Sequence, residues 1–366
     1  MSRKSILWIA VLCSLVIAFA GLAGCRSKDP VVVTPPAKDV EMTEEPEGSI
    51  YWPLTGLEAE NPQVTLGRTL SVKIDNHPQS GSKVGINSAD VVFETLAEGG
   101  ITRFNAVYQS DVPEQVMPVR SARDSDLHVV SQFGDSLFFY SGGNANVLGK
   151  LRDAGVTSMA HGTIGSDLYG RYSGRSAPHN LFVELAKAYE VATSKGFDVA
   201  TAESIAGLEF SNSKSNELTP SSAYRTATEA HVPFSPLSDT RWTWDSENKL
   251  WLRAAGGVTQ YDGASDEQIS ADNVVVMWAR HSEGSRAGGG TVTYDIDLVG
   301  GGNVAIFSDG KRFDGTWEGS ADAPPVFKDA EGNSILLTPG RTWISVVPLD
   351  QEIDSDAADA ASTTDY

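Results

Sequence analysis

The first 25 residues constrain this chain most, because they decide the compartment in which the rest has to fold. A positively charged start (Arg3, Lys4) precedes an uncharged apolar run, residues 6–20, and then small residues at Gly21, Ala23 and Gly24. This order is typical of a secretory signal peptide. The run has about 15 residues, fewer than the roughly 20 that a membrane-spanning helix needs. We therefore expect residues 1–24 to be removed and the mature chain to fold outside the cytoplasm.

The cleavage region, Leu22-Ala23-Gly24-Cys25, resembles the lipobox of bacterial lipoproteins. In such proteins the signal peptide is cut before the cysteine, whose thiol then carries a diacylglycerol with acyl chains such as palmitate. Two or more acyl chains, at about 0.8 kcal/mol per buried methylene, hold a protein stably at a membrane. The resemblance implies a lipoprotein attached through Cys25 to the outer face of the cytoplasmic membrane. An uncleaved anchor or ordinary secretion is the alternative.

Cysteine usage is limited to Cys13, in the apolar run, and Cys25. After cleavage the mature chain would keep Cys25 alone, and lipidation would occupy its sulfur. Disulfides, cysteine nucleophiles and cysteine-based zinc sites are therefore excluded. Removing 24 of the 366 residues leaves 342, enough to build a core whose stability comes from buried apolar surface.

The formal net charge is −20 for the whole chain, and loss of Arg3 and Lys4 makes the mature chain more acidic still. A strongly acidic protein is repelled by nucleic-acid phosphates and by anionic lipid surfaces. The sequence also lacks a stripe rich in Lys and Arg that would override this repulsion. We therefore exclude nucleic acid as a partner and assign the acidity to solubility.

Composition divides the mature chain into five segments. Residues 25–49 are rich in proline and acidic residues, which predicts a disordered tether. Residues 350–366, rich in Asp, Ala, Ser and Thr, predict a disordered acidic tail. Between them lie two patterned segments, 50–203 and 233–349, joined by the polar and weakly patterned segment 204–232.

Residues 50–203 mix strand and helix patterns. Leu70–Ile74 alternates apolar and polar residues, as in a half-buried strand. Two β-rich runs, 91–96 and 101–108, flank Gly99-Gly100, which predicts a hairpin. Helix patterns cover 121–133, a short stretch capped by Asn144, and 180–195 with Asn180 as N-cap, and a further strand pattern covers 136–140. This predicts a mixed α/β N-terminal lobe.

Residues 233–349 show short apolar runs separated by Gly- and Asp-rich turns, and no long helical period. Arg241–Trp244 and Leu250–Arg253, for example, flank a turn as in a hairpin. The expected fold class is therefore α+β, in which a mixed α/β N-terminal lobe is followed by a mainly antiparallel β C-terminal lobe. Six tryptophans fall in the second lobe, either as core or as an exposed stacking face: Trp242, Trp244, Trp251, Trp278, Trp317 and Trp343.

Short polar and Gly-rich motifs follow one another in a fixed order along the chain. They are Asp75-Asn76-His77-Pro78, Ala89 to Glu94, Glu98 to Phe104, Pro118 to Arg123, Ser141-Gly142-Gly143, His179-Asn180-Leu181, Gly315-Thr316-Trp317 and Asn333 to Pro348. Together they resemble the YerB-like lipoprotein family over about residues 51–348. The resemblance implies a two-part extracytoplasmic fold and no particular activity, because the family is one of unknown function. Gln260 departs from the family pattern, which has a His two residues before Asp262.

Polar side chains gather next to predicted strand ends and at the start of the helix predicted at 121–133. The candidate ligand-binding residues are Asp75, Asn76, His77, Glu94, Arg103, Arg120, Arg123, His179 and Asn180. Arg120 and Arg123 stand where the field of a helix N-terminus disfavours cations. They therefore either pair with an internal carboxylate or bind an external anion. The internal candidates are Asp124, Asp126, Glu94 and Glu98.

His77 and His179 have the acid/base chemistry that catalysis needs, and Ser121 or Ser141 with Asp75 would complete a triad. However, the sequence lacks the Gly-x-Ser-x-Gly pattern of a nucleophile elbow. It also lacks HExxH, paired histidine spacing, a P-loop and a GxGxxG motif. We therefore assign no catalytic residue, no metal site and no cofactor.

From these observations we expect a binding or interaction module for an anionic envelope ligand or an envelope protein. One alternative is a cell-envelope hydrolase that uses His77 or His179 with a carboxylate. Another is a structural scaffold that docks through the tryptophan-rich β lobe. An open pocket lined by the arginines and histidines would favour a ligand or a substrate, whereas closed internal pairs would favour the scaffold.

Overall fold

The computed structural model describes residues 50–59, 67–199, 206–211, 223–286 and 290–354. The predicted signal peptide, Cys25 and the predicted tether lie outside these residues, as do parts of the connecting segment and of the acidic tail. Within the described ranges, no helix combines the length and the apolar character that crossing a membrane requires.

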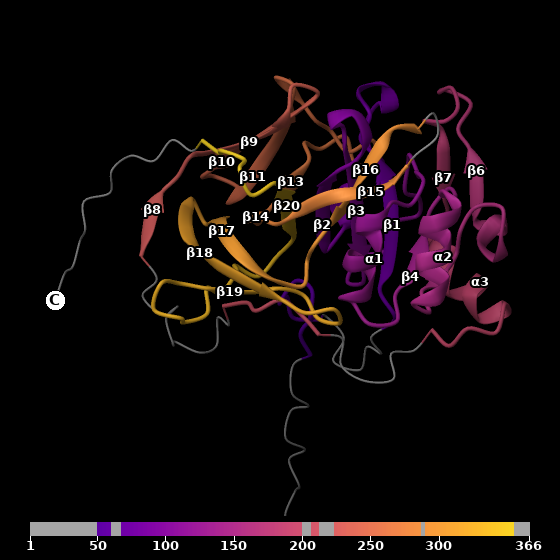
Figure 1. Ribbon diagram of the computed structural model, residues 1–366, viewed down its shortest axis with the longest axis horizontal. Coiled ribbons are helices and arrows are strands. Elements are labelled where there is room, and N and C mark those ends of the chain that lie inside the picture. Colours follow the sequence, from indigo (N-terminus) through magenta and orange to yellow (C-terminus); the bar gives the residue numbers. More distant parts are fainter. Residues whose placement is uncertain (1–49, 60–66, 200–205, 212–222, 287–289, 355–366) are drawn as a thin grey trace, which may run out of the picture. The chain divides into compact units, whose positions relative to one another are not determined.

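A mixed sheet of eleven strands forms the centre of the fold (Figure 1). Its N-terminal strands are β1 (Leu70–Asp75), β2 (Val91–Leu96), β3 (Thr102–Tyr108), β4 (Leu137–Phe139) and β5 (Thr157–Ser158). Its C-terminal strands are β8 (Tyr224–Thr226), β14 (Asn273–Trp278), β17 (Gly300–Ser308), β18 (Lys311–Gly319), β19 (Val326–Lys328) and β20 (Thr342–Val347). The strand order is β19-β18-β17-β14-β20-β2-β3-β1-β4-β5, and β8 pairs with β18.

The last strand, β20, joins the two patterned segments. It pairs in parallel with β14 on one side and with β2 on the other, so that Trp343 lies opposite both Val274 and Val92. The segments predicted as two lobes therefore share one continuous sheet. The boundaries given above for the two lobes, 50–203 and 233–349, stay a prediction.

Three smaller sheets, three α-helices and five short 3-10 helices make up the other regular elements of the described residues. A five-stranded antiparallel sheet contains β9 (Glu229–Ser235), β10 (Ser238–Asp245), β11 (Leu250–Ala255), β12 (Val258–Thr259) and β13 (Ser270–Ala271). Two hairpins are formed by β6 (Tyr169–Arg171) with β7 (Leu181–Val183), and by β15 (His281–Arg286) with β16 (Val292–Ile296). The α-helices are α1 (Asp124–Ser131), α2 (Ala145–Asp153) and α3 (Ala188–Ser194). The expected α+β class is confirmed.

Both faces of the central sheet are covered. On one face, Val72 and Phe104 belong to the same core cluster as Trp242 of the five-stranded sheet. On the other face, Phe93 packs with Val129 of α1 and its neighbours. Four of the six tryptophans are buried, which confirms the core interpretation for these side chains: Trp242, Trp251, Trp317 and Trp343.

The helix predicted at 180–195 is wrong over its first half. Leu181–Val183 forms strand β7 against β6, and α-helix begins only at Ala188. Leu181 and Val183 are buried while Phe182 between them is partly exposed, which is the two-residue period of a strand. Pairing with β6 thus overrides the local helical pattern.

Two segments predicted without regular structure also contain ordered parts. The segment predicted as a connection, 204–232, contains β8 and the start of β9. The segment predicted as a tail, 350–366, begins with residues that pack on the fold, since Asp354 forms a β-bridge with His231.

Candidate functional site

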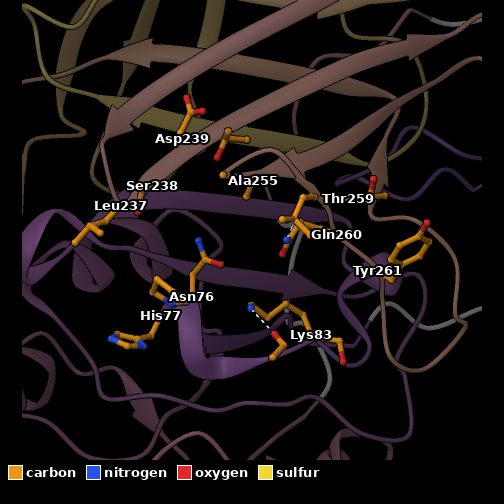
Figure 2. A pocket seen from close by; sticks show the side chains of 16 residues that line it. Asn76, His77, Lys83, Leu237, Ser238, Asp239, Ala255, Thr259, Gln260 and Tyr261 are labelled. Atoms are coloured by element: carbon orange, nitrogen blue, oxygen red, sulfur yellow. Dashed lines mark hydrogen bonds between the residues drawn. The ribbon is translucent and has the colours of Figure 1, made fainter.

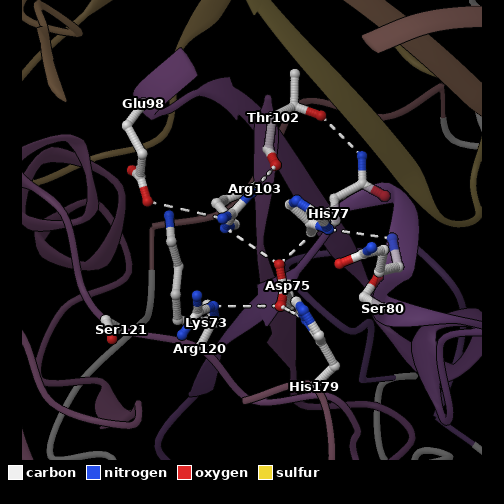
Figure 3. A network of polar contacts seen from close by, with 12 residues as sticks. Lys73, Asp75, His77, Ser80, Glu98, Thr102, Arg103, Arg120, Ser121 and His179 are labelled. Atoms are coloured by element: carbon white, nitrogen blue, oxygen red, sulfur yellow. Dashed lines mark hydrogen bonds and ion pairs between the residues drawn. The ribbon is translucent and has the colours of Figure 1, made fainter. Parts of the chain in front are cut away.

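Asp75 closes strand β1 and gathers cations around its carboxylate (Figure 3). Its Oδ1 lies 3.3 Å from Nε of Arg103, which stands directly opposite on β3. Its Oδ2 lies 3.2 Å from Nε of Arg120 and 2.7 Å from Nδ1 of His179. The sequence-predicted residues Asp75, Arg103, Arg120 and His179 therefore do come together.

Asp75 is fully buried, yet its surroundings favour the charged form. Burial by itself would raise the pKa of this carboxyl, but the Arg103 guanidinium, the hydrogen bond from the His77 N–H and Arg120 together hold the pKa below its ordinary value. The carboxylate is thus ionised at neutral pH and serves as a fixed negative centre for the side chains around it.

The two candidate histidines stack on each other, with ring centroids 5.1 Å apart and planes inclined by 24°. Nδ1 of His77 accepts a hydrogen bond from the Gln79 N–H at 3.1 Å, so the proton of the neutral ring resides on Nε2. Burial lowers the pKa of His77 and keeps this ring neutral, despite the opposing effect of Asp75. In His179 the contact with Asp75 favours the opposite tautomer, with the proton on Nδ1.

The group extends from Asp75 toward helix α1. Glu98 lies 3.7 Å from Arg103 and forms a bidentate pair with Arg123, in which Nε donates to Oε2 at 2.8 Å. Burial alone would raise the pKa of Glu98, but the hydrogen bonds from Arg123 lower it to about 2. Arg123, the N-cap residue of α1, thus has the internal partner that one of the two hypotheses required.

Beneath these pairs, Lys73 Nζ lies 2.6 Å from Asp126 Oδ1, and both side chains are buried. We call the whole group the Asp75 cluster: Lys73, Asp75, His77, Glu98, Arg103, Arg120, Arg123, Asp126 and His179. Its carboxylates, Asp75, Glu98 and Asp126, are shared by four cationic side chains, Lys73, Arg103, Arg120 and Arg123. One positive charge is therefore left over before either histidine takes up a proton.

Arg120 lies at the accessible edge of the Asp75 cluster. Its side chain is 23% exposed and that of His179 is 15% exposed, whereas Arg103 is only 2% exposed. Within the described part of the chain, Arg120 has the ion pair with Asp75 and no side-chain hydrogen bond. Its terminal nitrogens are therefore available to a ligand from outside.

Three predicted site residues lie apart from this cluster. Glu94 points to the opposite face of the sheet, where it pairs with Arg253 of β11. Asn76 donates to Thr102 Oγ1 at 2.8 Å. Asn180 accepts from Arg171 and donates to two carbonyls of its own loop, so its role is to shape that loop.

A cavity of about 460 Å³ adjoins the Asp75 cluster at His77 (Figure 2). The loop after β1 forms one side of it, and residues of β10, β11 and β12 with their connections form the other. Sequence reasoning missed two buried cations near this cavity, Lys83 in its wall and Arg253 behind it. Each is a single basic residue outside any recognisable motif, Lys83 in a Ser- and Gly-rich stretch and Arg253 in an apolar one. Gln260, which departs from the family pattern, also lines the cavity.

Comparisons with known proteins agree with the resemblance seen in the motifs. Residues 54–198 match the model described as protein of unknown function (DUF3048), N-terminal domain, and residues 230–344 match the corresponding C-terminal domain. The chain is 29% identical over 345 residues to "Putative lipoprotein YerB" of Bacillus subtilis (strain 168), covering 93% of this chain and 95% of that protein. The crystal structure of Bacillus subtilis YerB superposes with a TM-score of 0.71 at 28% identity, covering 83% of this chain and 99% of that one.

Proposed function

This chain belongs to the DUF3048 family of YerB-like proteins, and from that premise we propose that it is a lipid-anchored binding module for an anionic ligand of the cell envelope. The ligand would bind at the accessible edge of the Asp75 cluster, where Arg120 and the two histidines meet. The anchor would be the lipidated Cys25, on the outer face of the cytoplasmic membrane. The cysteine motif at residues 22–25 and the name of the Bacillus relative support this part.

The unequal charge of the Asp75 cluster is the observation that carries the proposal. Four cations share three carboxylates in a largely desolvated place, although the chain as a whole has a net charge of −20. Buried charges are stable when they are paired, so a surplus cation favours the arrival of an anion. Within the ranges that the structure describes, the terminal nitrogens of Arg120 have no hydrogen bond, and a planar guanidinium binds carboxylate or phosphate through two parallel hydrogen bonds.

The test is a thermal melt of the full-length protein in a non-ionic detergent at constant ionic strength, with and without inorganic phosphate. We expect phosphate to raise the melting temperature of the wild type, because a ligand that binds only the folded state stabilises it by mass action. Arg120→Gln should abolish this response. The matched control is Arg152→Gln, since the Arg152 side chain is 76% exposed and pairs with its neighbour Asp153 outside the cluster. A response that survives in Arg120→Gln would refute the proposal.

A second function, hydrolysis, is favoured by one contact. Asp75 Oδ2 and His179 Nδ1 are 2.7 Å apart, which orients the ring and leaves the Nε2 lone pair free to accept a proton. In this reaction a water would attack the ester of a bound envelope anion, its proton would pass to Nε2, and His179 would then protonate the leaving oxygen. Among the described residues no hydroxyl is hydrogen-bonded to Nε2, so water rather than serine would be the nucleophile.

Turnover of an anionic ester distinguishes the two functions. If the protein is a hydrolase, His179→Gln should lower the rate by about 10²–10⁴-fold, the usual contribution of a general base. His161→Gln is the control, because His161 contacts Tyr169 outside the cluster. If the wild type binds phosphate but turns over no ester faster than His179→Gln does, the binding function stands without the catalytic one.

A further inference from the structure

The loop after β1 buries a lysine in the wall of the cavity. Lys83 is 3% exposed, and its Nζ donates to Ser80 Oγ at 2.9 Å and to the Gly81 carbonyl at 2.8 Å. Both acceptors are uncharged. The amine therefore lies at the cavity without a carboxylate from the described residues within ion-pair distance.

Lys73, a second buried lysine of this protein, has a carboxylate partner and serves as a comparison for Lys83. Its side chain is as deeply buried as that of Lys83, but Asp126 Oδ1 lies 2.6 Å from its Nζ. A buried ammonium without a counter-charge is costly, and proteins either supply the partner or let the group lose its proton. For Lys83 the residues that the structure describes supply no carboxylate, so an external anion can take the place of the counter-ion.

The charged groups around Lys83 are mostly positive. Burial and repulsion by Arg253 lower the pKa of Lys83 to about 7, and Arg175 and Arg103 act in the same direction, while Asp75 opposes them. The carboxylate among the cavity-lining residues, Asp239, is already bonded to His231. An anion that enters the cavity would therefore pair with the Lys83 amine and favour its protonated form.

The opposite side of the cavity is apolar at its rim. Leu237, Val258 and Tyr261 line the cavity and are 58%, 63% and 50% exposed. Exposed large apolar side chains that cluster around a concave site are typical of ligand-binding surfaces. The volume of about 460 Å³ also falls in the range of small-molecule sites, roughly 300–1,000 Å³.

We propose that this cavity binds a small monocarboxylate with an apolar body, whose carboxylate pairs with Lys83 Nζ and whose body packs on Leu237, Val258 and Tyr261. A single ammonium matches a singly charged carboxylate, whereas a phosphate would favour the forked guanidinium of an arginine. The contacts of this site come from Lys83 and the apolar rim and not from Arg120, although His77 borders both sites.

The test compares phenylacetate with phenylacetamide, which share one shape and differ in charge, on the full-length protein by ligand-observed NMR. We expect phenylacetate to bind at least tenfold more tightly at pH 7. Because the carboxylate pairs with the ammonium form of Lys83, its affinity should fall by roughly tenfold per pH unit above pH 7. Arginine does not titrate in this range, so the Arg120 guanidinium by itself would not produce this dependence.

Two variants complete the test. Lys83→Met should remove the preference for phenylacetate, whereas Lys187→Met should keep it, since the Lys187 side chain is 58% exposed and pairs with Glu184. If Lys83→Met does not fold, Val258→Asp, at an exposed rim position, should weaken binding of phenylacetate more than that of phenylacetamide. Equal affinity of the wild type for the two probes, an affinity independent of pH between 6 and 9, or a preference that persists in Lys83→Met would each overturn the proposal.

Discussion

Arg253 of β11 pairs with Glu94 of β2 inside the protein, where Nη2 lies 3.0 Å from Oε1 and both side chains are fully buried. Thr102 and Trp343 also donate hydrogen bonds to the Glu94 carboxylate. The Arg253 guanidinium lies 5.0 Å from the centre of the Trp343 ring. This pair links residues 159 positions apart and ties the five-stranded sheet to the N-terminal part of the central sheet.

Glu94→Gln should therefore destabilise the whole fold. The substitution leaves the buried Arg253 charge without its partner, and breaking a buried pair in this way costs about 3–5 kcal/mol. Urea unfolding measures the change. Glu318→Gln is the control, because the Glu318–Lys328 pair is largely exposed and should contribute about 0–1 kcal/mol. Equal losses in the two variants would show that the Glu94–Arg253 pair has no special role.

Arg123→Ala tests whether the arginine at the start of α1 is structural. Its guanidinium forms a bidentate pair with Glu98, and their side chains are 10% and 20% exposed. Since hydrogen bonds between charged groups contribute about 1.5–3 kcal/mol, we expect a loss of about 2 kcal/mol in the free energy of unfolding. In the control Arg286→Ala, whose pair with Glu283 is exposed, stability should barely change. Unchanged stability of Arg123→Ala would return Arg123 to the ligand-binding candidates.

The same pair predicts a pH dependence. The pKa of Glu98 is lowered from 4.5 to about 2 in the folded state, so its contribution to stability is complete above pH 4.5 and is lost as the pH falls toward 2. The difference in unfolding free energy between wild type and Arg123→Ala should therefore shrink over this interval. Urea midpoints between pH 6 and pH 2.5 measure it. A difference that stays constant over the interval would contradict the Glu98 assignment.

Much of the fold could be predicted from sequence where local pattern and final environment agree. The hairpin of β2 and β3 and the helix capped by Asn144, whose side chain accepts from the Val147 N–H, are such cases. β1 shows the limit of the method. Its alternation is real, but the polar face holding Lys73 and Asp75 is buried against α1 rather than solvated. An alternating pattern shows that the two faces of a strand differ in polarity, but tertiary packing determines whether each face contacts solvent or other elements.

The candidate site was predictable to the extent that polar residues at strand ends share one sheet edge. Asp75 and Arg103 follow from this rule, whereas Arg120 follows from its place at the start of a predicted helix and His179 from its acid/base chemistry. Glu94 is predicted with them but lies on the opposite face of the sheet, where it pairs with Arg253. Side chains alternate between the two faces of a strand, and the position of a residue near a strand end does not show which face it is on. Lys83 could not be found, since its distinguishing property is the absence of a partner, which appears only in three dimensions.

Membrane attachment rests on Cys25, which lies outside the described residues. We expect Cys25→Ala to prevent lipidation and to leave the precursor uncleaved, with its first 24 residues still attached. The mass of the purified protein and its partition between membrane and soluble fractions measure both effects. Normal maturation of the variant together with unchanged membrane binding would contradict the lipobox interpretation.

The most direct test of anion binding at the Asp75 cluster is histidine NMR, because the chain contains six histidines and two of them, His77 and His179, belong to the cluster. The full-length protein would be titrated with inorganic phosphate at constant pH and ionic strength while the ring signals are followed. The proposed function predicts saturable shifts of the His77 and His179 signals, absent in Arg120→Gln, while His161 and His281 stay in place. Small, linear shifts of all six histidines alike, or no shift at His179, would contradict it.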